Sequence, residues 1–122
     1  MSTVCRGIRG ATTAEANTRE AILAATRELL ADIVQQNHIV PEDLAAVIFT
    51  TTRDLNAEFP ALAARQMGWN GVALMCGHEM EVPDGLPLCI RVLLLVNTTK
   101  KPDELVNAYL KGAKNLRSRG LG

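Results

Sequence analysis

Arg91 is the residue in this 122-residue sequence whose position most needs an explanation. It interrupts the apolar run CIRVLLLV at 89–96, and a guanidinium enclosed by apolar side chains stays charged and must be paired. The position predicts either a buried ion pair, with Glu79, Glu81 or another carboxylate, or an anion-binding site. Arg9, beside Gly10, is by itself typical of a solvated surface charge. Together, however, the two guanidinium groups could bind a dicarboxylate bidentately.

The segment CGHEM, which begins at Cys76, carries further reactive side chains. Cys76 and His78 could bind zinc with the distant Cys89, but structural zinc sites use four ligands in close pairs, and CxxC and HxxxH are absent. A Cys76–His78 nucleophile is disfavoured because no third group is indicated to orient the pair. Cys76 and Glu79 fit better as polar ligands of a substrate hydroxyl. Tyr109 is typical of a half-buried helix residue with a solvated hydroxyl.

Strands and helices of a small mixed domain must position these groups. Alternating or β-branched apolar residues predict strands at 4–9, 46–52, 72–75 and 89–96. The last of these is almost continuously apolar, which predicts burial on both faces.

Three helices are expected between and after the strands. Asn17 with Glu20 resembles a capping box, and the apolar stripe that follows predicts a helix to about Gln36. Pro60 suits the start of a short helix that Gly68 ends. The residues Pro102, Asp103 and Glu104 predict a third helix that carries Leu105, Tyr109 and Leu110.

This order of elements predicts one α+β domain over residues 1–122, with helices on one face of a mixed sheet and a polar tail from about 117. The other face of the sheet also needs cover. For so short a chain, a second copy is an economical way to supply it, so we expect a homo-oligomer.

Composition narrows the function classes. Thirteen basic and thirteen acidic residues balance, which gives no support for electrostatic binding to nucleic acid or to an anionic membrane. No apolar stretch approaches the roughly 20 residues that span a bilayer, and no secretory signal is evident. The spacing of Cys5, Cys76 and Cys89 fits no disulfide framework. We therefore expect a cytoplasmic protein with reduced thiols.

Several motifs taken together resemble a known family. RGIRGATT at 6–13, DLNAEFPA at 54–61, C-x-x-E-M at 76–80 and CIRV at 89–92 are similar to the trimeric, monofunctional chorismate mutases of the AroH class. The similarity extends over nearly the whole chain. It implies a trimeric pseudo-α/β-barrel with active sites in clefts between subunits. It also implies a cofactor-free and metal-free rearrangement of chorismate to prephenate in phenylalanine and tyrosine biosynthesis.

Residue by residue, the resemblance implies that Arg91, Arg9 and Glu79 are catalytic. Arg9 would bind a substrate carboxylate, and Arg91 would reach both a carboxylate and the ether oxygen of the breaking bond. Tyr109 would hydrogen-bond a carboxylate, while Cys76 and Glu79 would hold the ring hydroxyl. The remaining implied substrate-binding residues are the apolar Phe59, Ala61, Met75 and Leu116, with Arg65 and Arg117 at the cleft mouth.

The implied reaction is an intramolecular rearrangement without proton transfer, so its catalyst must select a compact conformer and stabilise charge developing on the ether oxygen. Arg91 is the predicted source of that stabilisation. Leu62 stands where the family pattern has a lysine, which predicts weaker attraction of the dianionic substrate. Two alternatives are a non-catalytic trimeric module that binds a small carboxylate through Arg9 and Arg91, and a hydrolase that uses Cys76.

Overall fold

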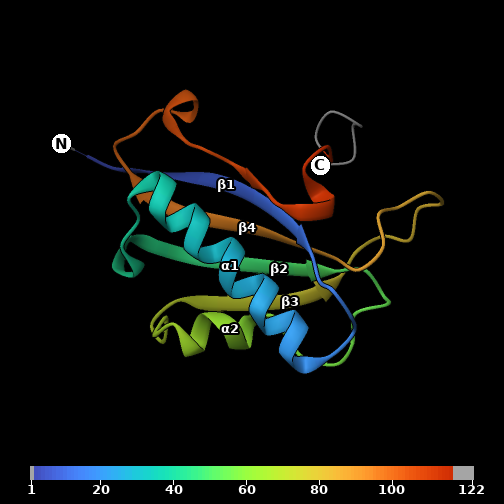
Figure 1. Ribbon diagram of the computed structural model, residues 1–122. Coiled ribbons are helices and arrows are strands. Elements are labelled where there is room, and N and C mark those ends of the chain that lie inside the picture. The colour runs from blue at the N-terminus through green and yellow to red at the C-terminus, as the bar shows by residue number, and fades with distance from the viewer. Residues whose placement is uncertain (1, 117–122) are drawn as a thin grey trace.

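A five-stranded sheet forms the centre of the computed structural model, which describes residues 2–116 (Figure 1). Its strand order is β3-β2-β4-β1-β5. Strand β4 is antiparallel to β1 and β2, whereas β3 is parallel to β2 and β5 is parallel to β1. This mixed sheet with helices on one face confirms the predicted α+β class. The strands are β1 (Val4–Thr13), β2 (Leu44–Thr51), β3 (Ala73–His78), β4 (Cys89–Thr98) and β5 (Ala108–Tyr109).

Helix α1 (Arg19–Asn37) crosses one face of the sheet (Figure 1). It begins one residue later than expected, because the side chain of Thr18 accepts the capping hydrogen bond from the backbone N–H of Ala21 at 3.1 Å. The predicted cap, Asn17, instead accepts hydrogen bonds from backbone N–H groups at 56 and 57. The start of α1 is thereby attached to the loop that follows β2.

The short helix α2 (Ala61–Gln66) follows Pro60 and lies beside β3 at the edge of the sheet, as Figure 1 shows. Its existence confirms the interpretation of Pro60 as a helix start. Gly68 follows with a φ of +92°, a left-handed conformation that suits glycine and ends the helix. Single 3-10 turns occur at Pro41–Asp43, Pro102–Glu104 and Lys111–Ala113.

The third predicted helix was wrong. Pro102 does open a 3-10 turn, but the chain then extends and forms β5 beside β1. The side chain of Asn37 donates to the carbonyl of Val106 at 2.9 Å and accepts from its N–H at 2.8 Å. Because Asn37 pairs with both backbone groups of Val106, an extended chain there leaves neither unsatisfied.

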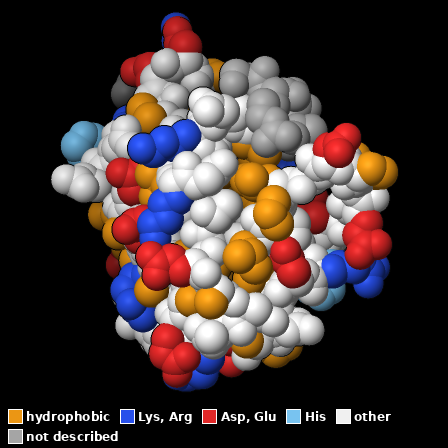
Figure 2. All heavy atoms as spheres, turned by 45° about the vertical axis from the view of Figure 1, so that its right-hand side comes forward, with side chains coloured by type: hydrophobic (Ala, Val, Ile, Leu, Met, Phe, Trp, Pro, Cys, Tyr) orange, Lys and Arg blue, Asp and Glu red, His pale blue; other side chains and the backbone are white. Residues whose placement is uncertain are grey.

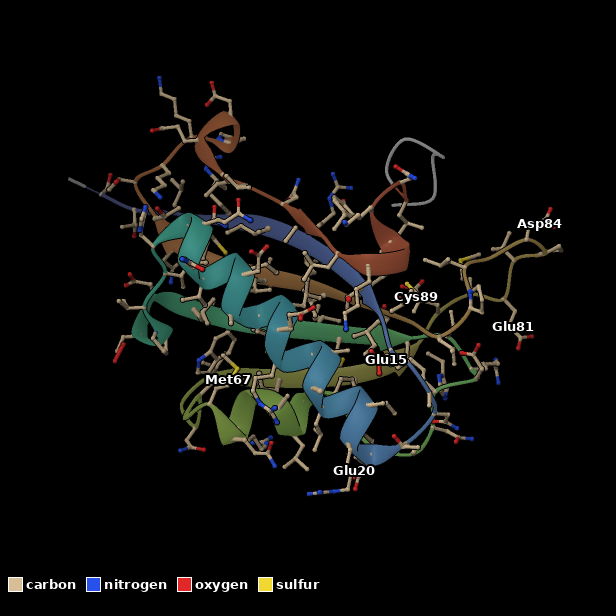
Figure 3. The ribbon with its side chains drawn as sticks, in the orientation of Figure 1. Glu15, Glu20, Met67, Glu81, Asp84 and Cys89 are labelled. Atoms are coloured by element: carbon tan, nitrogen blue, oxygen red, sulfur yellow. The ribbon has the colours of Figure 1, made fainter. Side chains whose placement is uncertain are left out.

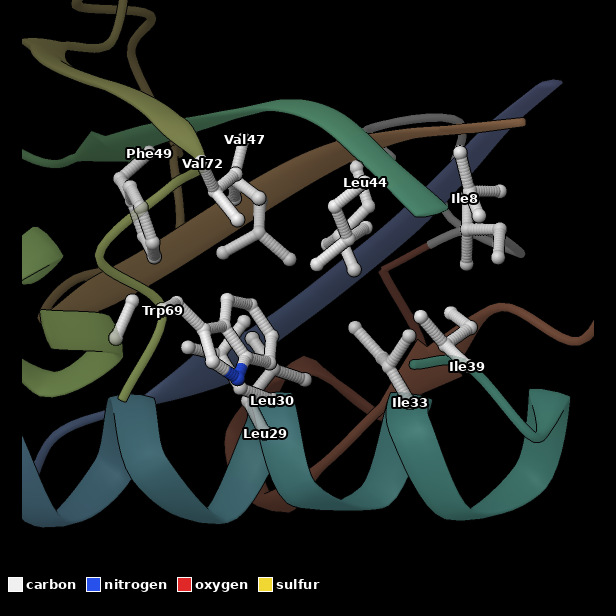
Figure 4. Close-up of a cluster of buried hydrophobic side chains, with 14 of the residues drawn as sticks. Ile8, Leu29, Leu30, Ile33, Ile39, Leu44, Val47, Phe49, Trp69 and Val72 are labelled. Carbon is white, nitrogen blue, oxygen red and sulfur yellow. The ribbon is translucent and has the colours of Figure 1, made fainter. Parts of the chain in front are cut away.

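The main core lies between α1 and the sheet (Figure 4). Leu29 and Ile33 of α1 pack in one cluster with Ile8, Phe49 and Leu94 of the strands, and all five are fully buried. Each such side chain contributes roughly 1.5–3 kcal/mol through burial. The first strand reaches Thr13 rather than ending near Gly10, and its last three residues pair with the start of β4.

Strand β4 presents two different faces. Ile90, Val92, Leu94 and Val96 are buried, while the intervening residues from 91 to 95 are only partly buried. The expectation of burial on both faces is therefore wrong for a single chain. We call the face opposite α1, which carries Arg91, the open face of the sheet.

Charged side chains of both signs are interspersed over the side of the molecule drawn in Figure 2. This agrees with the balanced composition of 13 basic and 13 acidic residues. Neither helix in the described part of the chain is long and apolar enough to cross a membrane.

Candidate active site

The open face of the sheet contains a cavity of about 220 Å³ that brings together Arg9, Glu79, Arg91 and Tyr109. We call it the arginine cavity. These four residues come from β1, β4, β5 and the residue that follows β3. The remaining lining residues are Gly10, Ile48, Thr50, Val92 and Leu93.

The strand register explains why these side chains meet. Arg91 is paired with Ala11 on β1 and with Thr50 on β2, and Ala11 is in turn paired with Tyr109 on β5. Residues paired across a sheet place their side chains on the same face, and so do residues two apart on one strand. Arg9 lies two positions before Ala11, so the pleat directs it to the same face.

Glu79 is the partner that Arg91 requires. Its carboxylate Oε2 lies 3.2 Å from Nη1 of Arg91, and both side chains are only partly exposed, at 23% and 36%. The backbone N–H of Glu79 donates to the carbonyl of Thr51 at 2.8 Å, which fixes the carboxylate beside β2. The ion pair predicted from the sequence is therefore present, and it does not exclude an anion site, because the paired guanidinium still lines the cavity.

The other carboxylate considered for Arg91, Glu81, lies 3.2 Å from Arg53 instead. Figure 3 shows Glu81 and Asp84 on the loop between β3 and β4, which extends away from the sheet. Cys89 lies where this loop rejoins the fold and is almost completely buried.

Tyr109 differs from its expected environment. It lies on β5 rather than on a helix, and its hydroxyl is buried without a hydrogen-bond partner among residues 2–116. An unpaired buried hydroxyl costs roughly 1–3 kcal/mol. A ligand carboxylate in the arginine cavity is the kind of acceptor that would satisfy it.

A second group of predicted residues lies around α2 and β3. Phe59 and Cys76 line a cavity of about 350 Å³ with His78, and they also line one of about 330 Å³ with Ala61, Leu62 and Arg65. Cys76 and Glu79, which were expected to share a hydroxyl ligand, therefore line different cavities of one chain. The side chain of Phe59 is 70% exposed.

The environment of the Cys76 thiol does not favour a nucleophilic thiolate. Burial raises its pKa, and a hydrogen bond with the backbone of Ala61 and the charge of Arg65 oppose that rise only in part. The reactive thiolate is consequently disfavoured at neutral pH. Within residues 2–116, no three His, Cys, Asp or Glu side chains are grouped so that they could hold a metal ion.

Two further predicted residues, Met75 and Leu116, line none of these cavities. Met75 is paired with Ile48 across β3 and β2 and is 66% exposed on the open face. Leu116 is buried in a small cluster with Ala11 and Ala113. Arg117 lies outside the described residues.

Sequence reasoning missed Thr50 and Ile48 as lining residues. Both lie in the apolar segment LAAVIFTT, where threonine and isoleucine are ordinary strand residues. The alternation along β2 could have indicated that both share a face, but the sequence does not indicate that this face is opposite Arg91.

Comparisons with known proteins show the family of this chain. The family model described as Chorismate mutase type I matches residues 5–119. Chorismate mutase AroH of Bacillus subtilis (strain 168) is 45% identical over 113 residues, or 92% of this chain and 89% of the relative. Chorismate mutase AroH of Thermus thermophilus is 52% identical over 113 residues, or 92% of this chain and 93% of the relative.

A solved structure of a related protein also has a similar fold. The solved structure of a chorismate mutase from Clostridium thermocellum has a TM-score of 0.88 and 48% sequence identity to this chain. The match covers 89% of this chain and 97% of that one. The chain therefore belongs to the type I chorismate mutase family.

Proposed function

We propose that this chain is a chorismate mutase that rearranges chorismate to prephenate in phenylalanine and tyrosine biosynthesis. The observation that carries the proposal is the arginine cavity, in which Arg9, Arg91 and Tyr109 surround one space in a chain of this family. Two guanidinium groups and an unpaired hydroxyl suit a ligand with two carboxylates and an ether oxygen. The reaction needs no cofactor, because it is a concerted intramolecular rearrangement without proton transfer, a redox step or a covalent intermediate.

Arg9 and Tyr109 would select the reactive conformer. Chorismate rearranges only from a compact arrangement, and groups that hold its carboxylates at fixed positions supply that arrangement in advance. Arg9 lies on β1 and Tyr109 on the adjacent β5, so the sheet fixes the distance between the two groups. Their partly buried environment strengthens each contact relative to water.

Arg91 would stabilise the transition state. Negative charge develops on the ether oxygen as the carbon–oxygen bond lengthens, and a fixed cation beside it binds the transition state more tightly than the ground state. The ion pair with Glu79 holds the guanidinium in place, so that it need not reorganise during the reaction. In this scheme Glu79 also accepts a hydrogen bond from the ring hydroxyl of the substrate.

We further propose that the working form is a homotrimer arranged as a pseudo-barrel, with each active site shared by two subunits. Support comes from the distribution of the predicted site residues over separate cavities of one chain. Some of them line the arginine cavity, whereas Phe59, Ala61, Arg65 and Cys76 line the two cavities around α2 and β3. A neighbouring copy could place its Phe59 side of the molecule against the arginine cavity. The open face, on which Met75 is exposed, would then be covered as well.

We also propose a cytoplasmic location. The thiols of Cys5, Cys76 and Cys89 are free in the structure, which suits a reducing compartment.

The test is the decay of chorismate absorbance with purified, chelator-treated protein, followed by acid conversion of prephenate to phenylpyruvate. Decay with stoichiometric prephenate is the expected result, and light scattering should give the mass of three chains. If the folded trimer binds chorismate without turnover, the protein is the carboxylate-binding module considered above. If a covalent adduct forms at Cys76, the hydrolase alternative applies.

A further inference from the structure

Thr50 lies directly opposite Arg91 in the pairing of β2 with β4. Both side chains line the arginine cavity, and Thr50 is only partly buried. Thr50 is the first polar residue of β2, because the side chains from 44 to 49 are all apolar and only Thr51 follows it. A valine would have nearly the same shape and strand preference, so the shape of the strand does not by itself account for a hydroxyl here.

The hydroxyl of Thr50 donates a hydrogen bond to Oε2 of Glu79. The same oxygen lies 3.2 Å from Nη1 of Arg91. One carboxylate oxygen is thus held from two sides, by a donor on β2 and by a cation on β4. This leaves the carboxylate little freedom to rotate about its terminal bond.

The backbone adds a third constraint. The N–H of Glu79 donates to the carbonyl of Thr51, so the residue that follows β3 is attached to β2 through both its main chain and its side chain. Glu79 directly follows β3 and so begins the loop between β3 and β4. Figures 1 and 3 show that this loop extends away from the sheet. A side chain at the start of such a loop needs anchoring if it is to stay in one orientation.

We propose that Thr50 is a positioning residue for the mutase reaction, whose hydroxyl fixes the Glu79 carboxylate and, through it, the Arg91 guanidinium. The inference rests on the proposed function. Thr50 acts on two groups at once. Its hydrogen bond to Oε2 orients the Glu79 carboxylate, and a carboxylate held in this way cannot pull the Arg91 guanidinium out of the cavity. The guanidinium is then fixed and still available to the substrate.

The first experiment compares Thr50→Val with Thr50→Ser. Thr50→Val keeps the β-branched shape and removes the donor, so kcat/KM should fall about tenfold to a hundredfold, the range for losing a hydrogen bond to a charged group. Most of the loss should appear in kcat, because a loosened Arg91 affects the transition state more than substrate binding. Thr50→Ser keeps the donor and should retain at least about a third of wild-type kcat/KM.

A matched control is Thr26→Val. Thr26 is fully buried on α1, away from the arginine cavity, and its hydroxyl donates to the carbonyl of Ile22. This variant makes the same chemical change and should keep wild-type kcat and KM, even if its melting temperature shifts. Circular dichroism and thermal unfolding of all variants establish that each one folds.

A double-mutant cycle separates positioning from direct contact with the substrate. If Thr50 acts through Glu79, then Thr50→Val should change kcat/KM less than about twofold in a Glu79→Ala background. An undiminished effect in that background would show that Thr50 contacts the substrate itself and would overturn the inference. Wild-type kinetics in Thr50→Val would overturn it as well.

Failure of the proposed function is distinguishable from failure of this inference. If the wild-type protein leaves chorismate unchanged, the mutase proposal fails and the inference fails with it. If the wild type is active and Thr50→Val equals it, only the positioning role of Thr50 is lost.

Discussion

The carboxylate of Glu79 lies 3.2 Å from the guanidinium of Arg91, and both groups line the cavity that contains Arg9 and Tyr109. The pair neutralises a charge that would otherwise be costly on an apolar strand. It also holds that charge beside a space that a ligand can enter. Arg91 therefore has a structural partner and a free surface at the same time.

Arg91→Lys should lower kcat about a hundredfold to a thousandfold, which corresponds to losing roughly 3–4 kcal/mol of transition-state stabilisation. A lysine ammonium cannot bind Glu79 and the substrate through two separate prongs. The rate at which chorismate absorbance decays, followed in a spectrophotometer or by stopped flow, measures the effect. Arg6→Lys is the control, because Arg6 lies on β1 outside the arginine cavity. Near wild-type turnover in Arg91→Lys contradicts the role assigned to Arg91.

Tyr109→Phe should raise KM for chorismate about tenfold without lowering the melting temperature. The hydroxyl is buried and has no hydrogen-bond partner among residues 2–116, so removing it costs the folded protein nothing. A bound substrate carboxylate, in contrast, loses the hydrogen bond that the Tyr109 hydroxyl would donate, and KM rises. Steady-state kinetics with differential scanning calorimetry check both parts, and a destabilised variant with unchanged KM would show that the hydroxyl serves the fold.

Leu62→Lys should lower KM several-fold at low ionic strength and leave kcat unchanged. Leu62 lines a cavity with Arg65 and Cys76, where an added cation would attract a dianionic substrate. The gain should shrink as salt rises from about 0.01 M to 1 M, because the screening length falls from about 30 Å to 3 Å. Leu62→Gln serves as the uncharged control, and an equal KM in the two variants would exclude an electrostatic effect.

Gly10→Ala should destabilise the fold by about 1–3 kcal/mol through overpacking. An added Cβ would lie 2.7 Å from Cδ1 of Ile33 and 3.2 Å from the carbonyl oxygen of Ala108. Gly71→Ala is the matched control, because nothing lies within 4 Å of a Cβ built there. Urea unfolding measures both variants, and equal midpoints would mean that α1 and β5 can move away from β1 at little cost.

The Cys89 thiol should make stability depend on alkaline pH. Burial raises its pKa to about 11, with Arg91 opposing the rise and Glu79 and Asp54 adding to it, against 9.0 for an ordinary thiol. Since the pKa is raised in the folded state, the protonated thiol contributes to the free energy of unfolding. This contribution is complete below pH 9 and is lost as the pH rises towards 11. The loss is at most about 1.4 kcal/mol per pH unit.

The measurement for Cys89 is the difference in unfolding free energy between wild type and Cys89→Ala from pH 8 to pH 11. The difference should narrow above pH 9. Cys5→Ala is the control, because Cys5 is exposed and its replacement should leave the alkaline slope of the wild type unchanged. A constant difference for Cys89→Ala would contradict the predicted effect of burial.

The sequence predicted the elements whose patterns are local. The apolar stripe of α1, the proline start of α2 and the apolar run of β4 each correspond to an element of the structure. The charge of Arg91 within that run correctly indicated a carboxylate partner, and Glu79 was among those named. Such inferences succeed because a few neighbouring residues determine them.

The sequence did not predict the elements that depend on distant contacts. The two residues of β5 are a strand because they pair with β1, and the extended chain before them depends on the amide of Asn37. The role inferred for Thr50 likewise depends on its register with Arg91 and on the start of the next loop. Threonine is so common in strands that its type alone indicates nothing about a hydrogen bond.

The strand order places β1 next to β5, so the arginine cavity joins Arg9 to a tyrosine 100 positions later in the chain. A nascent chain cannot bind substrate there until residue 109 has left the ribosome. Closing so long a segment before β1 and β5 can pair also carries an entropic cost, which favours slow folding. Substrate present during synthesis can consequently stabilise only chains in which nearly all of the sheet is already in place.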